Sequence, residues 1–183
     1  MNQVKKAEIM DESTMRRAIN RISYEIIEHN HGVSGVVLAG VRTRGVFLAQ
    51  RIAEKIEEVE GVCPDIVSLD ISAFRDDKHT VSDDSNMSMV QDIEQKTVII
   101  TDDVLFTGRT VRAAMEAVLS GGRAKSIQLA VLIDRGHREL PIRPDYIGKN
   151  LPTSRIETVR VNMKEIDGKD SVVILTDAET EKQ

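Results

Sequence analysis

The apolar residues of the chain recur at helical spacing in three segments. The first covers residues 12–30 and follows Asp11, a residue type that caps helices well. The second covers 48–59 and the third 111–118, where the pair Gly121-Gly122 is expected to end the helix. We therefore expect three amphipathic helices, each with one face buried against the rest of the protein.

Short continuous apolar runs separate these helices and predict strands that are buried on both faces. They cover residues 35–40, 66–71, 97–101, 126–133 and 172–175. Strand and helix alternate three times, and each crossover is long enough to join parallel strands. The pattern predicts an α/β fold with an open, mostly parallel sheet flanked by helices. Ligands of such sheets bind beyond the carboxyl ends of the strands.

Composition narrows the classes of function. The 183 residues carry 25 Lys and Arg against 30 Asp and Glu, so a protein that is basic throughout is excluded and any RNA contact needs a local patch. The single cysteine, Cys63, excludes a disulfide framework. No apolar run reaches the roughly 18 residues of a membrane span, and residues 1–8 lack a signal-peptide core. We expect one cytoplasmic domain over 1–183, with a frayed tail at 177–183 and no membrane contact.

The segment 98–110 is the most informative part of the chain. An apolar strand leads into two adjacent acids, and a Thr-Gly-Arg-Thr turn then opens a helix. The N–H groups at a helix N-terminus suit a phosphate, and paired carboxylates can accept hydrogen bonds from vicinal hydroxyls, so the segment fits a ribose 5-phosphate. A Walker A loop is excluded, because Val46 and Phe47 follow the glycine pair 40 and 45. The segment reads Val98, Ile99, Ile100, Thr101, Asp102, Asp103, Val104, Leu105, Phe106, Thr107, Gly108, Arg109, Thr110.

This segment resembles the phosphoribosyl pyrophosphate (PRPP) signature of type I phosphoribosyltransferases. Three further strings, at 40–45, 74–77 and 134–142, resemble the PyrR family, and the similarity runs from about residue 10 to about residue 175. That family comprises attenuation regulators of pyrimidine operons that are also uracil phosphoribosyltransferases. The resemblance implies the type I phosphoribosyltransferase fold, in which a small hood lies beside the main sheet.

The resemblance also implies roles for individual residues. The whole segment 98–110 would bind PRPP, with Asp102 and Asp103 on the ribose hydroxyls and Thr107 to Thr110 on the 5-phosphate. Thr43 and Arg44 would bind pyrophosphate. Arg75, on a long polar loop at 74–92, would close over the substrate. Mg²⁺ would bind together with PRPP near the two acids, without a site made by protein side chains alone. The catalytic residues implied are Asp102, Asp103, Arg44 and Arg75.

Uracil and RNA are the other ligands that the resemblance implies. Ile133, Asp134 and Arg135 would read uracil. Leader mRNA of a pyrimidine operon would bind a basic surface, with UMP or UTP as effector, and the chain would form a homodimer or a larger homo-oligomer. Between 134 and 160, six Lys and Arg face four acids, a mild local excess of positive charge. The RNA candidates are Arg17, Asn20, Arg21, Tyr24, His137, Arg138, Arg143 and Lys149.

Three positions depart from the pattern of the family. Threonine is expected at position 20, histidine at 24 and arginine at 29, whereas this chain has Asn20, Tyr24 and His29. A plain uracil phosphoribosyltransferase without RNA-binding regulation is therefore an open alternative. If catalysis and RNA binding use separate surfaces, replacing Arg138 and Arg143 with alanine should remove RNA binding and leave UMP synthesis near normal.

Overall fold

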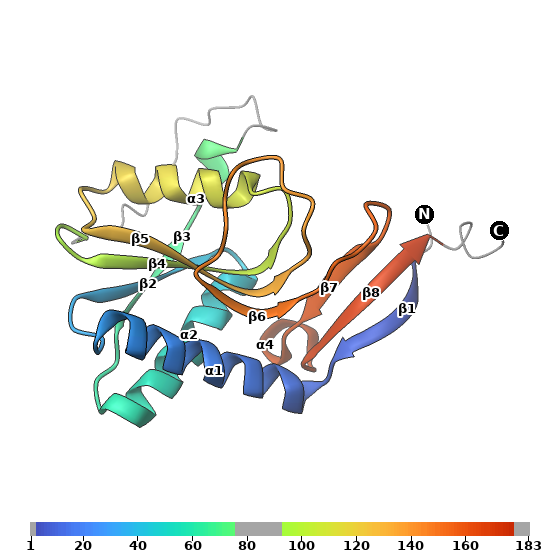
Figure 1. Cartoon of the computed structure of the whole chain (residues 1–183), viewed down its shortest axis with the longest axis horizontal. Coiled ribbons are helices and arrows are strands. Elements are labelled where there is room, and N and C mark those ends of the chain that lie inside the picture. Colours follow the sequence, from blue (N-terminus) through green and yellow to red (C-terminus); the bar gives the residue numbers. More distant parts are fainter. Residues whose placement is uncertain (1–2, 76–92, 178–183) are drawn as a thin grey trace.

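A five-stranded parallel sheet forms the centre of the molecule (Figure 1). The computed structural model describes residues 3–75 and 93–177, so most of the predicted polar loop lies outside the described residues. The sheet has the order β3-β2-β4-β5-β6, and each neighbouring pair is parallel. The strands are β2 (Val36–Val41), β3 (Asp65–Leu69), β4 (Thr97–Leu105), β5 (Ser126–Asp134) and β6 (Tyr146–Asn150).

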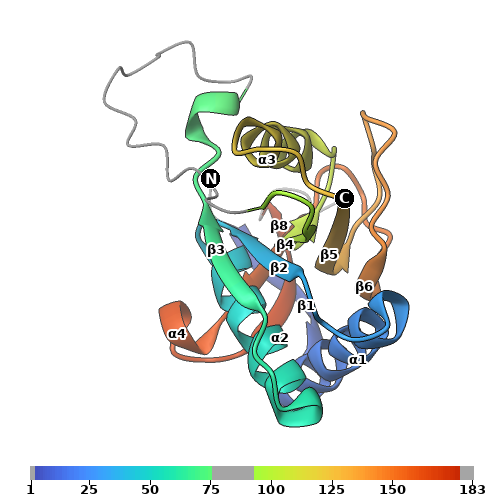
Figure 2. The same ribbon diagram turned by 90° about the vertical axis from the view of Figure 1, so that its left-hand side faces the viewer.

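Helices cover both faces of this sheet (Figures 1 and 2). Helices α1 (Glu12–Asn30) and α2 (Arg44–Glu60) pack on one face, and α3 (Arg109–Ser120) packs on the other. The Asp11 carboxylate accepts a hydrogen bond from the Thr14 N–H at 2.8 Å, which confirms the predicted helix start. The expected α/β architecture is therefore confirmed. None of the helices in the described ranges is long and apolar enough to cross a membrane.

A second, three-stranded antiparallel sheet forms a small hood (Figure 1). Its order is β1 (Gln3–Met10), β8 (Ser171–Asp177), β7 (Thr158–Asn162), and the short helix α4 (Lys164–Asp167) lies between β7 and β8. The predicted final strand is present as β8, but it belongs to this hood. Arg51 of α2 makes ion pairs with Glu165 at 2.7 Å and with Asp170 at 2.8 Å, so the hood is fixed to the main domain.

The sequence did not predict β1, β6, β7 or α4, and it ended β4 too early. β4 was expected to stop at residue 101, but it pairs with β5 as far as Leu105. The two acids therefore lie within the strand, and its hydrogen bonds to β5 fix their backbone. The 3-10 helix η1 (Ser72–Phe74) follows β3 and is tied to α3, because the Arg112 guanidinium donates a hydrogen bond to the Phe74 carbonyl at 2.8 Å.

Candidate active site and basic surface

The two adjacent acids of β4 lie at the carboxyl edge of the main sheet. Asp102 is buried, with 8% of its surface exposed, and Asp103 is half-buried. The Asp102 carboxylate accepts a hydrogen bond from the Asp103 N–H at 2.9 Å. Burial and the neighbouring charge of Asp103 raise the pKa of Asp102 well above its ordinary value. Burial also raises the pKa of Asp103. The two carboxylates therefore favour a cation or a hydroxyl donor beside them.

Arg44 is a cation whose charge acts on Asp103. It begins α2, after the cis peptide between Arg42 and Thr43. Its charge lowers the pKa of Asp103 and so opposes the larger effect of burial. One Arg44 nitrogen, Nη2, lies 3.2 Å from both carboxylate oxygens of Asp167 in the hood. Its Nε is buried and has no hydrogen-bond partner among the described residues. An unsatisfied buried donor is costly, so an anion at this point would be favoured.

Asp167 is a residue that the sequence did not single out. It follows β7 in the short helix α4, where an acid ordinarily serves as a cap or faces solvent. Hydrogen bonding from the Met163 N–H, at 2.9 Å, and the Arg44 charge lower its pKa. No local pattern shows that α4 faces the start of α2, because that contact depends on how the hood docks.

The start of α2 and the strand β4 approach each other closely. A Cβ atom on Gly45 would lie 2.3 Å from the Thr101 carbonyl oxygen, so only glycine fits there. The Thr101 hydroxyl is buried and donates a hydrogen bond to the Gly45 carbonyl at 2.8 Å. This contact brings Thr43 and Arg44 beside Asp102 and Asp103, as the sequence predicted for one sheet edge.

The turn between β4 and α3 presents a helix N-terminus at the same edge. Gly108 has a φ of 94°, which favours glycine, and α3 begins at Arg109 without an acid in its first turn. The backbone N–H groups and the positive end of α3 can therefore receive an anion. The Thr107 carbonyl accepts hydrogen bonds from the Glu139 and Leu140 N–H groups, at 2.9 and 3.2 Å, which hold the turn from behind.

Only part of the predicted PRPP segment can contact a ligand through side chains. Val98, Ile99 and Ile100 are fully buried, and Leu105 is 2% exposed, so these residues build the strand and the core. Thr101 is committed to the start of α2. The half-buried residues of the segment are Asp103, Val104, Phe106, Thr107 and Thr110. Arg75 is exposed directly after η1, and the closing movement expected of its loop concerns residues outside the described ranges.

The predicted uracil residues have unequal access to a ligand. Ile133 is fully buried in the core. Arg135 is 7% exposed, and its guanidinium donates hydrogen bonds to Thr153, Ser154 and Glu157 at 2.7 to 3.1 Å. The same guanidinium lies 4.1 Å from the centre of the Phe106 ring. Arg135 therefore links the end of the PRPP segment to the loop after β6, and both Asp134 and Arg135 line a cavity.

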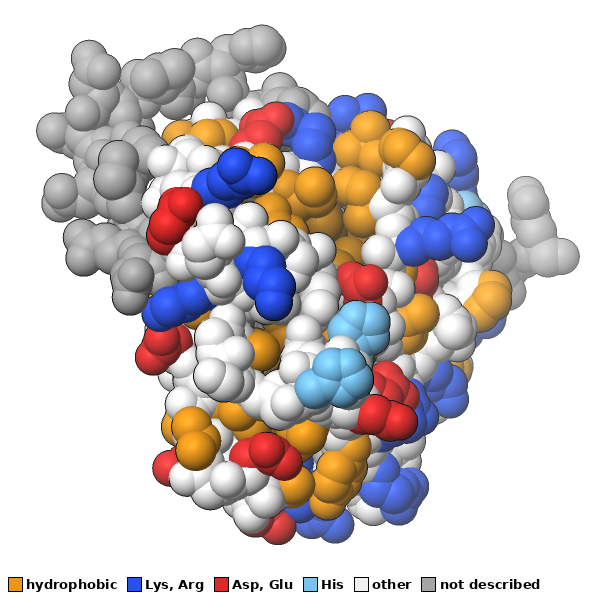
Figure 3. Space-filling view, turned by 60° about the vertical axis from the view of Figure 1, so that its left-hand side comes forward, with side chains coloured by type: hydrophobic (Ala, Val, Ile, Leu, Met, Phe, Trp, Pro, Cys, Tyr) orange, Lys and Arg blue, Asp and Glu red, His pale blue; other side chains and the backbone are white. Residues whose placement is uncertain are grey.

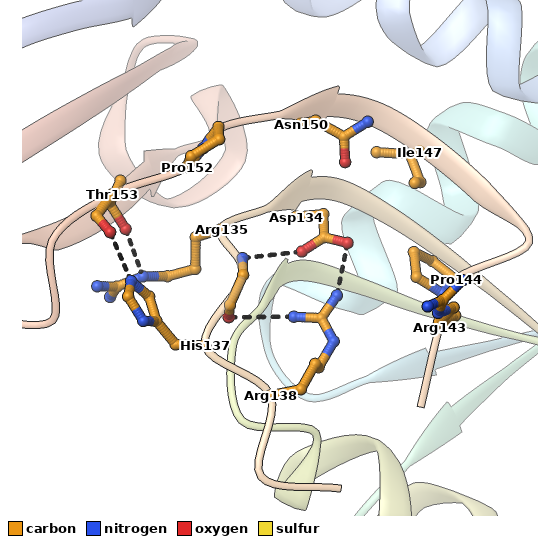
Figure 4. Close-up of a pocket in the computed structure, with 11 residues that line it drawn as sticks. Asp134, Arg135, His137, Arg138, Arg143, Pro144, Ile147, Asn150, Pro152 and Thr153 are labelled. Carbon is orange, nitrogen blue, oxygen red and sulfur yellow. Dashed lines mark hydrogen bonds and ion pairs between the residues drawn. The ribbon is translucent and has the colours of Figure 1, made fainter. Parts of the chain in front are cut away.

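Arg138, predicted to bind RNA, is used by the protein itself (Figure 4). Its guanidinium is paired with Asp134 at 2.5 Å. It also donates hydrogen bonds to the backbone carbonyls of Phe106 at 2.8 Å, Ile142 at 3.0 Å and Gly136 at 3.2 Å. The side chain thus connects β5 to the turn that precedes α3, so Arg138 holds the candidate phosphate site in shape.

The remaining RNA candidates fall on two sides of α1. Arg21 donates hydrogen bonds to the Ile147 and Gly148 carbonyls of β6, beside the exposed side chain of Lys149. On the other side, Asn20 lines a groove between α1 and α2, and the Lys55 ammonium lies 5.6 Å from the ring centre of Tyr24. Arg17 contacts Ser13 and Thr14 of its own helix, and His137 contacts the Thr153 carbonyl.

The structure therefore brings Arg21, His137, Arg138, Arg143 and Lys149 to the side of β5 and β6, and it separates Asn20 and Tyr24 from them. Figure 3 shows another face, the one at the left of Figure 1, where basic and acidic side chains are interspersed.

Comparisons with known proteins agree with this geometry. The phosphoribosyl transferase domain family matches residues 6–174. A protein of Clostridioides difficile named "Bifunctional protein PyrR" is 54% identical over 174 residues, covering 93% of this chain and 98% of the relative. A protein of the same name from Bacillus pumilus is 55% identical and covers 92% and 97%.

Solved structures support the fold. A hypoxanthine phosphoribosyltransferase of Staphylococcus aureus has a TM-score of 0.71 at 20% identity, covering 98% of this chain and 99% of that one. The enzyme of Trypanosoma cruzi in complex with IMP has a TM-score of 0.72 at 18% identity, covering 97% and 95%. The chain has the type I phosphoribosyltransferase fold, and it belongs to the PyrR family of phosphoribosyl transferase domain proteins.

Proposed function

We propose that this chain makes UMP and pyrophosphate from uracil and PRPP, and that it also binds pyrimidine-operon leader mRNA and regulates attenuation in response to UMP or UTP. The word "Bifunctional" in the names of its relatives supports two activities over a plain uracil phosphoribosyltransferase. One observation carries the transferase activity. A buried acid pair, the N-terminus of α3 and Arg44 all lie at one sheet edge. Residues 1–183 act as one domain.

PRPP binds across this edge. The carboxylates of Asp102 and Asp103 accept hydrogen bonds from the ribose hydroxyls, and the N–H groups from Thr107 to Thr110 receive the 5-phosphate. The pyrophosphate lies against Thr43 and Arg44, where the unpartnered Nε of Arg44 is an available donor. Asp102 and Asp103 belong to β4 and Arg44 begins α2, while Thr43 and Thr107 lie in the turns that lead into α2 and α3, so the substrate is oriented before it reacts.

The acid pair also fits the cation that accompanies PRPP. The carboxylate oxygens of Asp102 and Asp103 are ligands of the kind that Mg²⁺ prefers, and the raised pKa values of both acids support a cation beside them. The described residues contain no cluster of three or more candidate metal ligands, so the remaining ligands would come from substrate and water. Bound Mg²⁺ would neutralise part of the pyrophosphate charge.

The reaction follows from the charges at this edge. The bond between ribose C1 and pyrophosphate breaks, and the sugar passes through an oxocarbenium-like state. Arg44 stabilises the departing negative charge, and the carboxylates of Asp102 and Asp103 stabilise the positive charge that develops on the sugar. Uracil N1 then bonds to C1 and loses its proton, which gives UMP.

The turn proposed to bind the nucleotide phosphate contacts the segment that carries the basic residues. Arg138 contacts the Phe106 carbonyl, and Glu139 and Leu140 contact the Thr107 carbonyl. A nucleotide phosphate at Thr107 to Thr110 would therefore order the same backbone from which His137 and Arg143 extend. This connection supports UMP and UTP as effectors of RNA binding, because a ligand changes an affinity only through contacts that differ between two states.

The experiment that tests the proposal measures both activities on one preparation. UMP formation is followed with uracil and PRPP, and binding of labelled leader RNA is followed with and without UMP at two salt concentrations. RNA binding that tightens with UMP and weakens with salt is expected. UMP synthesis without RNA binding would establish the plain transferase instead. Sedimentation of the same sample tests the expected homodimer or larger assembly.

A further inference from the structure

A cavity of about 490 Å³ lies beyond the carboxyl ends of β5 and β6 (Figure 4). One wall is the segment from Asp134 to Arg138, and the opposite wall contains Arg143, Pro144, Ile147 and Asn150. Its volume falls within the range of small-molecule sites, about 300 to 1,000 Å³. No residue of the segment 98–110 lines it, and neither does Thr43 or Arg44. The cavity is therefore distinct from the site proposed for PRPP.

The lining combines apolar surfaces with two exposed polar side chains that can contact a ligand. Ile147, Pro144 and Pro152 supply apolar surface, as a flat ring requires. Asn150 and Arg143 are exposed, and neither side chain makes a hydrogen bond or ion pair with another described residue. The Asn150 amide offers one acceptor and two donor hydrogens, which match the edge of a nucleobase. The Arg143 guanidinium suits a phosphate or the face of a base.

Two exposed basic side chains lie at the cavity. Arg143 lines it and Lys149 lies beside Asn150 on β6, whereas the charge of Arg138 is paired with Asp134. Sequence-specific proteins read single-stranded RNA by splaying out unpaired bases, stacking them and bonding to their edges. We infer that this cavity receives one unpaired base of the bound RNA. The base edge meets the Asn150 amide, its ring lies against Ile147 and Pro144, and Arg143 contacts an adjacent phosphate. The inference rests on the proposed RNA binding and adds a base-reading site to it.

The cavity is poorly placed for the uracil of the transferase reaction. That base must lie one bond from a ribose held by Asp102 and Asp103, and neither residue lines the cavity. Each Asp134 oxygen already accepts one hydrogen bond, Oδ1 from the Gly136 N–H at 3.0 Å and Oδ2 from Arg138. The free polar groups of the cavity are thus on the β6 side, away from the nucleotide site.

The test is a double-mutant cycle between protein and RNA. Each nucleotide of the leader RNA is replaced in turn by an abasic residue, and binding is measured with the wild type and with Asn150→Ala. At one nucleotide, the abasic change and Asn150→Ala should each weaken binding about tenfold, as for loss of one base contact. Together they should weaken it no further. Because Asn150 is exposed, its replacement should leave the melting temperature unchanged.

Lys149→Ala serves as the matched control on the same strand. It should weaken binding of the unmodified and the abasic RNAs alike and reduce the slope of log affinity against log salt by about 1. Additive losses for Asn150→Ala at every nucleotide would overturn the base pocket while leaving RNA binding established. A raised KM for uracil in Asn150→Ala would instead assign the cavity to the transferase substrate and also overturn the inference. A wild type that binds no leader RNA would refute the proposed regulation itself.

Discussion

The charged residues at the end of β4 and those after β5 differ in how far the protein itself supplies their hydrogen-bond partners. Asp102 is buried and Asp103 is half-buried beside it, and burial raises both pKa values. Arg135 and Arg138 are also largely covered, but backbone carbonyls and Asp134 accept hydrogen bonds from their guanidinium groups. The acid pair is left without enough compensation, whereas the two arginines are satisfied within the protein.

This difference distinguishes side chains that are available to bind a ligand from side chains that stabilise the fold. A buried charge without a full set of partners costs stability and persists where function requires it. A guanidinium that donates to several carbonyls has few N–H groups left that could donate hydrogen bonds to RNA. Arginines at nearby positions can therefore have different roles, one in the fold and one in ligand binding. Arg143 and Arg138 are five residues apart, and only the former is free of hydrogen bonds to the described residues.

The largest expected effect comes from removing one charge of the acid pair. Asp103→Asn should reduce the turnover of UMP synthesis about 100-fold or more, the typical scale for loss of one preorganised electrostatic contact. Steady-state kinetics with uracil and PRPP measure the effect, and circular dichroism checks the fold. Turnover near the wild-type value would remove Asp103 from the ribose site and would make the acid pair a structural feature.

The second effect distinguishes the two arginines. Arg138→Ala should destabilise the protein by about 2 kcal/mol, because a charged donor is lost from partly buried acceptors. It should also raise the KM for PRPP, since Arg138 supports the Phe106 carbonyl. Urea denaturation and kinetics measure both changes. The sequence-based expectation treated Arg138 and Arg143 alike, with UMP synthesis near normal when both are alanine.

Arg143→Ala is the control for that comparison. It removes an exposed side chain with no hydrogen bond in the described structure, so stability should change by no more than about 0.5 kcal/mol. Its RNA binding should fall, while UMP synthesis stays at the wild-type rate. If both variants keep stability and synthesis and lose only RNA binding, then the contacts of Arg138 contribute little and the original expectation holds.

The main sheet could be predicted from sequence, because strands buried on both faces are continuous apolar runs. β2, β4 and β5 are such runs, and their carboxyl ends locate the site without further information. β1 has the sequence QVKKAEIM, and most of its side chains are exposed. β7 is shorter and also mixed, with the sequence TVRVN. Both strands pair with β8, and the pairing of β1 with β8 joins the two ends of the described chain, which no local pattern reveals.

Contacts between distant segments limited the prediction of the site as well. The acids, Gly45 and the α3 turn belong to local motifs, so they could be found. The donors of Arg135 are consumed by a loop 18 to 22 residues away in sequence, and Asp167 reaches Arg44 from 123 residues away. Whether an arginine serves a ligand or the fold depends on such acceptors, which the sequence does not position.

A third effect tests the hood as part of the site. Asp167→Asn keeps an oxygen for the Met163 N–H and removes the charge that faces Arg44. Without this ion pair Arg44 should be less well positioned, and the KM for PRPP should rise about fivefold, equivalent to about 1 kcal/mol. Turnover should change less than KM. Glu8→Gln, which removes the exposed Lys5–Glu8 pair of β1, should change neither constant.

An unchanged or lower KM in Asp167→Asn would reverse the interpretation. In that case Asp167 competes with pyrophosphate for Arg44, and the hood restrains the arginine until the substrate arrives. Comparing Asp167→Asn with Asp167→Ala separates positioning from capping, because alanine also leaves the Met163 N–H without its acceptor.

The smallest expected effect is on the stability of Asp103→Asn, which should increase although the turnover of this variant falls. The pKa of Asp103 is raised in the folded state, chiefly by burial, so its ionised form destabilises the fold at neutral pH. This penalty grows as pH rises from the unfolded pKa through the folded pKa, and it vanishes at lower pH, where both states are protonated. Asp103→Asn should therefore stabilise the protein by about 1 kcal/mol at pH 7, as substitutions at strained functional sites often do.

The advantage of Asp103→Asn should disappear as the pH falls toward 4, and thermal melts of both proteins across this range measure it. Glu165 provides the contrast within the same molecule. Hydrogen bonds from Arg51 lower the pKa of Glu165, so its contribution is present above the unfolded pKa and is lost as pH falls through the folded one. Wild type and variant share that loss, and only the acid pair makes their melting curves converge. Curves that stay parallel at every pH would mean that Asp103 has its charge compensated in the free protein, and the contrast with the satisfied arginines would fail.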